Sequence, residues 1–157
     1  MKSISTLLIG FLISTVHLSA VNAADLPKHQ VKDINEFNLS QYKGKVIYLD
    51  FWASWCKPCQ KSFPWMNELQ KKHPADQFEV VTINLDRKSS DMDVFLKNVP
   101  AEFTVYHDPS GNVAQQFKLP GMPTSFIIDK QGKVIKKHVG FYDKLKPEIE
   151  NEIQSQL

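Results

Sequence analysis

The two cysteines of the chain, Cys56 and Cys59, are separated by only two residues, and this spacing constrains the fold more than any other feature. A disulfide that closes so small a loop adds little stability, because the loss of loop entropy in the unfolded chain shrinks with loop length. The pair is therefore better suited to a disulfide that is reversibly reduced and re-formed than to one that stabilises the fold. Pro58 lies between them, and proline is favoured in the first turn of a helix. The spacing predicts a helix that begins here, with Cys56 at its N-terminus.

A cysteine at a helix N-terminus is chemically activated, because unpaired N–H groups and the positive end of the helix dipole stabilise its thiolate. Lys57 adds a positive charge beside it. We therefore expect Cys56 to be the exposed nucleophile and Cys59 to be the sheltered thiol that resolves a mixed disulfide.

Two less favoured interpretations of the cysteine pair are a structural disulfide and a metal site. Zinc takes four side-chain ligands, of which this pair supplies two. The histidines beyond the first 23 residues are dispersed and show no matching spacing; they are His29, His73, His107 and His138. We expect no metal and no cofactor, the Cys56–Cys59 disulfide being itself the redox group.

Residues 1–23 have the features of a secretory signal peptide. Lys2 precedes a largely apolar stretch from Leu7 to Leu18, and small residues precede a cleavage site expected after Ala23. An uncleaved anchor is the alternative. We expect one domain over residues 24–157, exported to a bacterial periplasm. The formal net charge of +2 argues against nucleic acid or an anionic membrane as the main partner.

The remaining chain alternates between strand and helix patterns. We expect strands at 46–52, 78–85, 103–107, 124–129 and 133–139, and helices at 56–72, 91–98, 112–117 and 143–156. Ser90 or Asp91 is the expected cap of the second helix. Pro64 should kink the first helix. This order predicts an α/β fold, a mixed sheet with helices on both faces and the cysteines at its carboxyl edge.

Four motifs together resemble the thioredoxin superfamily. Asp50–Cys59 is similar to the thioredoxin active-site sequence almost residue for residue, and Pro64 falls where those proteins kink their active-site helix. Gly121–Thr124 resembles the segment with a cis-proline that faces the disulfide. Val139–Phe141 resembles the glycine-containing edge of the substrate groove. The resemblance implies a thioredoxin-like fold and thiol–disulfide oxidoreductase activity.

Two departures from plain thioredoxin refine this resemblance. The interval between Asp86 and Pro123 is longer and holds an extra β/α insertion. Together with the export signal, the insertion is similar to TlpA/ResA-type and DsbE-type exported oxidoreductases. In addition, Thr82 stands where thioredoxins place a lysine near the aspartate equivalent to Asp50. Without that partner, burial should raise the pKa of Asp50.

The resemblance and the residues together suggest a division of roles. Asp50 would accept the proton that Cys59 loses during resolution. Pro123, if cis, leaves the backbone of Met122 free to pair with an extended client. Trp52 is expected in the core. The expected catalytic residues are Cys56, Cys59 and Asp50, and the expected substrate-binding residues are Trp55, Lys57, Pro58, Met122, Pro123 and Phe141.

The favoured function is reduction of client disulfides, with cytochrome c maturation or metal-site assembly as candidate roles. A reductase in an oxidising compartment needs electrons from a membrane thiol–disulfide partner. The Lys57-Pro58 pair stabilises the thiolate and points mildly towards oxidation. A disulfide oxidase or isomerase is therefore one alternative, and a non-catalytic chaperone for Cu(I) or a client is another. We expect a monomer.

Overall fold

The computed structural model describes residues 31–157. The predicted signal peptide, its cleavage after Ala23 and His29 lie outside the described residues. The strands are β1 (Val31–Asp33), β2 (Val46–Trp52), β3 (Phe78–Asn84), β4 (Thr104–His107), β5 (Thr124–Ile128) and β6 (Val134–Val139). The α-helices are α1 (Lys57–Lys72), α2 (Ser89–Asn98), α3 (Asn112–Gln116) and α4 (Lys146–Gln154), and short 3₁₀ helices span Ile34–Glu36, Leu39–Tyr42 and Asp143–Leu145.

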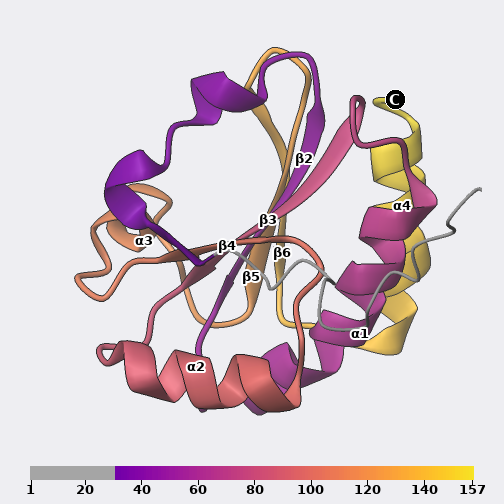
Figure 1. Ribbon diagram of the computed structural model, residues 1–157. Coiled ribbons are helices and arrows are strands. Elements are labelled where there is room, and N and C mark those ends of the chain that lie inside the picture. The colour runs from indigo at the N-terminus through magenta and orange to yellow at the C-terminus, as the bar shows by residue number, and fades with distance from the viewer. Residues whose placement is uncertain (1–30) are drawn as a thin grey trace, which may run out of the picture.

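The six strands form one mixed sheet in the order β1-β4-β3-β2-β5-β6. The pairs β1–β4, β4–β3 and β3–β2 are parallel, whereas β2–β5 and β5–β6 are antiparallel. The mixed α/β sheet expected from the sequence is confirmed. The strand β2 lies at its centre, so the turn that follows β2 occupies the middle of the carboxyl edge (Figure 1).

Alternate residues of β2 face opposite layers, as the pleat of a strand requires. Tyr48 and Trp52 pack with buried residues of α1, α2 and α4. Leu49 and Phe51 pack on the other face with α3 and the N-terminal 3₁₀ helices. Helices therefore cover both faces of the sheet, as Figure 1 shows with α1 and α4 on one side and α3 on the other.

Trp52 is fully buried, as expected, at the junction of β2, α1 and α2. Its ring lies 4.7 Å, between centroids, from both Phe63 of α1 and Phe95 of α2. Phe63 and Phe95 contact each other at 4.9 Å. This aromatic cluster packs the inserted helix α2 against α1, the helix that begins directly after Cys56.

Two helix starts differ from the sequence-based expectation. The helix α2 begins at Ser89, and its N-cap is Lys88 without a side-chain cap, so the expected Ser90 or Asp91 cap is wrong. The last helix opens with the 3₁₀ turn Asp143–Leu145. The reason is Pro147, whose missing N–H cannot bond back to Asp143; the N–H of Lys146 takes that carbonyl instead. Within residues 31–157, no helix combines the length and apolarity needed to cross a bilayer.

Candidate active site

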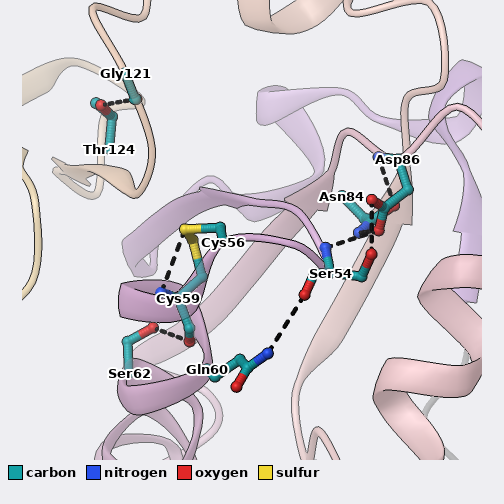
Figure 2. Close-up of a disulfide and its surroundings, with 9 residues drawn as sticks. All are labelled: Ser54, Cys56, Cys59, Gln60, Ser62, Asn84, Asp86, Gly121 and Thr124. Carbon is teal, nitrogen blue, oxygen red and sulfur yellow. Dashed lines mark hydrogen bonds between the residues drawn. A yellow bond between two sulfur atoms is a disulfide. The ribbon is translucent and has the colours of Figure 1, made fainter.

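The cysteine pair lies at the junction between the end of β2 and the start of α1. The Cys56 N–H donates to the Ala53 carbonyl at 3.0 Å, and Cys56 is the N-cap of α1 in an extended conformation. Its Sγ accepts the backbone N–H of Cys59 at 3.3 Å, with Pro58 in the first helical turn. The two sulfurs are bonded, and their Cα atoms lie 5.3 Å apart (Figure 2). The prediction of a cysteine pair across the first turn of a helix is confirmed.

The two cysteines differ in depth, but less than expected. Cys59 is 0% exposed, and Cys56 retains only 5% of its surface. The expectation of an exposed nucleophile is therefore wrong for the disulfide form, because the Cys56 sulfur is bonded to an interior partner. Around it, Trp55 is 70% exposed, and Lys57 and Pro58 are also exposed.

Asp50 is buried in the middle of β2, with 1% of its surface exposed. It lies in register with Thr82 of β3, as the sequence suggested. The Thr82 hydroxyl is engaged elsewhere, because it accepts from Trp52 Nε1 at 3.2 Å and donates to the Thr104 carbonyl at 3.3 Å. Within residues 31–157, the Oδ2 atom of Asp50 has no hydrogen-bonding partner. Desolvation raises the pKa of this carboxyl well above its ordinary value.

Asp50 shares its side of the sheet with α1. Asp50 lies two residues from both Tyr48 and Trp52 along β2, so its side chain points to the same face of the sheet, where these two pack on Trp65 and Phe63 of that helix. Burial, and secondarily the negative charge of Asp50, also raise the pKa of Tyr48. The carboxyl thus faces the same interior layer as Cys59, which belongs to the same buried cluster as Tyr48 and Trp52.

The Gly121–Thr124 segment approaches the site from the other side. The Met122–Pro123 peptide bond is cis, as the resemblance implied. The Thr124 hydroxyl donates to the Gly121 carbonyl at 2.7 Å. Met122 and Trp55 line one open cavity of about 630 Å³, together with Leu85, Gly111, Ala114, Gln115, Lys118, Leu119, Pro120 and Gly121.

Phe141 is not brought into this cavity. Its ring packs at a tilt against Trp65, with 5.4 Å between the ring centroids, and the Lys146 ammonium lies 5.5 Å from the Phe141 centroid. The neighbouring Gly140 donates its N–H to the Pro123 carbonyl at 2.8 Å, and its φ of 82° is in the region that favours glycine. The structure therefore joins Val139–Phe141 to the Pro123 segment through the backbone rather than through the Phe141 ring.

The histidines within the described residues serve separate local contacts. His73 packs on Phe78, and desolvation lowers its pKa. His107 contacts the Asp86 carbonyl, and His138 pairs with Glu152. No group of three or more His, Cys, Asp or Glu within residues 31–157 is arranged to hold a metal ion.

Sequence reasoning missed one polar group beside the cysteines. Asp86 is 2% exposed and accepts hydrogen bonds from the backbone and hydroxyl of Ser54, two residues before Cys56 (Figure 2). An available signal was its place just beyond β3, since parallel neighbours end at the same edge of a sheet.

The sheet, the cis-proline segment and the helix-capping disulfide together define a thiol–disulfide oxidoreductase with a thioredoxin-like fold. Comparison with known proteins agrees. The Redoxin family profile matches residues 20–153, and the chain belongs to this family.

Individual relatives carry the same class of activity in their names. The chain is 36% identical over 118 residues to the thiol-disulfide oxidoreductase ResA of Bacillus thuringiensis subsp. konkukian, covering 74% of this chain and 68% of that protein. A putative thiol:disulfide interchange protein DsbE from Chlorobium tepidum is 52% identical, with a TM-score of 0.73 over 75% of this chain and 84% of that one. The exposed lipoprotein thioredoxin Etrx1 of Streptococcus pneumoniae is 34% identical, with a TM-score of 0.66 over 76% and 90%. The predicted TlpA/ResA/DsbE-like class is confirmed.

Proposed function

We propose that this protein is an exported reductase of client disulfides, cycling between the Cys56–Cys59 dithiol and disulfide. The observation that carries the proposal is the Cys56 sulfur at the N-terminus of α1, where it accepts the Cys59 N–H. The same contact would stabilise a Cys56 thiolate in the reduced protein. We place the protein in a bacterial periplasm, with residues 1–23 as a cleavable signal peptide, and infer that it acts as a monomer.

The first step is attack of the Cys56 thiolate on a client disulfide. A bond forms between Cys56 and one client sulfur, and the other client sulfur leaves as a thiolate. The exposed Trp55, Lys57 and Pro58 and the half-buried Met122 would meet the client around the sulfur. Neither backbone group of Met122 is hydrogen-bonded within residues 31–157, which leaves both free for an extended client strand.

The second step releases the reduced client. Cys59 loses its proton and attacks the Cys56 sulfur, which re-forms the Cys56–Cys59 disulfide and expels the client thiolate. The client gains two electrons and the protein loses two. Asp50 would accept the Cys59 proton, directly or through one water, because a buried carboxylate without hydrogen-bond donors is a stronger base than one in bulk water.

The cycle requires re-reduction by a membrane thiol–disulfide partner, since the periplasm is oxidising. Cytochrome c maturation or copper-site assembly would be processes with suitable clients. Phe141 would contribute to client binding only through the edge that Gly140 joins to Pro123.

The test traps the mixed disulfide of the first step in one cysteine variant and prevents its formation in the other. A C59S variant, reduced and mixed with a disulfide-containing client, should accumulate a client–protein mixed disulfide, whereas a C56S variant should form none. Equal trapping by the two variants would overturn the assignment of Cys56 as the nucleophile. The wild-type protein should reduce the client catalytically when a dithiol is supplied; a chaperone that only binds would not accelerate that reduction.

A further inference from the structure

We propose that Asp86 is a positioning residue of the active site, whose carboxylate holds Ser54 and so fixes the turn that presents Cys56 to the N-terminus of α1. This role concerns the Cys56 thiol itself and holds whatever the client or the direction of electron flow.

The backbone N–H, the hydroxyl and the carbonyl of Ser54 are all hydrogen-bonded. The Ser54 N–H donates to Asp86 Oδ2 at 2.9 Å, and its hydroxyl donates to Oδ1 at 3.0 Å. Its carbonyl accepts from Gln60 Nε2 at 3.4 Å (Figure 2). Every polar group of Ser54 is therefore engaged, and two of the three contacts end on Asp86. Hydrogen bonds to a carboxylate are stronger than those between neutral groups, and a pair of them to one residue fixes its orientation.

Asp86 is itself held by the last residues of β3 and β4. Asn84 Nδ2 donates to Asp86 Oδ2 at 2.8 Å, and the Asp86 N–H donates to Asn84 Oδ1 at 3.0 Å. The His107 ring at the end of β4 donates to the Asp86 carbonyl at 2.8 Å. Within residues 31–157, no cation pairs with the carboxylate. Burying an anion is costly, so its hydrogen bonds to Ser54 and Asn84 account for its presence.

The hydrogen bonds between Asp86 and Ser54 lie close to the nucleophile Cys56 in the chain. Only Trp55 separates Ser54 from Cys56, and Cys56 closes the turn by donating to Ala53. If Ser54 is released, the Cys56 sulfur loses its fixed place against the Cys59 N–H, and the thiolate loses part of its stabilisation.

The test measures the apparent pKa of Cys56 in the fully reduced protein, from the pH dependence of its alkylation by iodoacetamide. This assay needs no client, so it stands apart from the test of the reductase function. In Asp86→Ala we expect the Cys56 pKa to rise by roughly one unit, which slows alkylation up to tenfold below that pKa. Loss of a negative charge alone would favour the thiolate and shift the pKa downward. A rise is therefore specific to lost positioning.

Two variants serve as controls. In Asp86→Asn the amide oxygen can accept both N–H donors, and the amide nitrogen can donate to the Ser54 hydroxyl, so the Cys56 pKa should not rise. In Asp108→Ala a buried carboxylate just beyond β4, which accepts hydrogen bonds from Ser110, Asn112 and Val113 and none from Ser54, is lost, and the Cys56 pKa should not rise.

An unchanged Cys56 pKa in folded Asp86→Ala would overturn the proposal, and so would an equal rise in Asp108→Ala or Asp86→Asn. If Asp86→Ala does not fold, Ser54→Ala carries the test, because it removes one of the two contacts and keeps the backbone intact. A smaller rise in that variant supports the proposal, and none contradicts it.

Discussion

The residue that most affects both stability and chemistry is Asp50, a buried carboxyl for which β2 and β3 offer no cation. Ionising it inside the sheet costs free energy that ionising it in the unfolded chain does not. The structure retains it nonetheless, in the layer that also holds Cys59. A residue that weakens the fold in this way is expected to be retained for its function.

At the residue scale, the first prediction concerns the rate of resolution. Asp50→Asn removes the proton acceptor but keeps the volume of the side chain. We expect the second step, attack of Cys59 on the Cys56 mixed disulfide, to slow roughly 10²-fold at neutral pH. Quenched-flow analysis of a preformed mixed disulfide measures this step directly. The first step, measured in the C59S background with and without the Asn substitution, is the control and should keep its rate within a few-fold.

The second prediction concerns stability against pH. Because folding raises the pKa of Asp50, the folded protein holds this proton more tightly than the unfolded chain does. The contribution of Asp50 to stability is therefore fully present below the unfolded-state pKa of about 4 and is lost as pH rises towards the folded-state value. The loss is about 1.4 kcal/mol per pH unit within that window.

Urea unfolding of the oxidised protein at several pH values checks this slope. The free energy of unfolding of wild type should fall relative to that of Asp50→Asn as pH rises above about 4, and the variant should be the more stable at neutral pH. Parallel profiles for the two proteins would show that Asp50 titrates in the folded state as it does in the unfolded chain.

At the element scale, the last helix covers the α1 side of the sheet through one apolar stripe. Leu145, Ile149 and Ile153 are all buried in the cluster that contains Cys59. Ile149→Ala should therefore lower the free energy of unfolding by about 2–5 kcal/mol, through lost burial and the cavity left behind. Val94→Ala on the exposed face of α2 is the matched control and should change it by less than about 0.5 kcal/mol. Urea midpoints measure both, and equal effects would mean that α4 does not seal the core.

Regular elements with a clear apolar period could be predicted from the sequence. The strand β2 matched in type and limits, and the buried stripe Leu145, Ile149 and Ile153 matched in position, because burial dictated both. The helix ends around Lys88 and Pro147 could not be predicted, since single hydrogen bonds decide them. The role of Asp86 was missed for a related reason: its partner Ser54 lies 32 residues away in sequence, and only the parallel pairing of β2 with β3 brings them together.

At the scale of the whole molecule, the sheet gathers contributions from distant parts of the chain at one edge. The cysteines follow β2, Asp86 follows β3, His107 ends β4, and the cis-proline segment leads into β5 (Figures 1 and 2). Residues from four strand ends thus surround the turn that carries the Cys56–Cys59 disulfide. The inserted α2 and β4 extend this edge, and α2 packs through Phe95 on the aromatic cluster of Trp52 and Phe63.

The direction of electron flow is a property of the whole molecule, because the same turn can donate or accept electrons. Its reduction potential reflects the difference in stability between the oxidised and reduced folds. The most direct measurement is equilibration of residues 24–157 against defined thiol/disulfide buffers. We predict a potential near that of thioredoxin, roughly −270 mV, as a reductase requires. A potential near that of DsbA, about −120 mV, would contradict the proposed direction and make the protein an oxidase or isomerase.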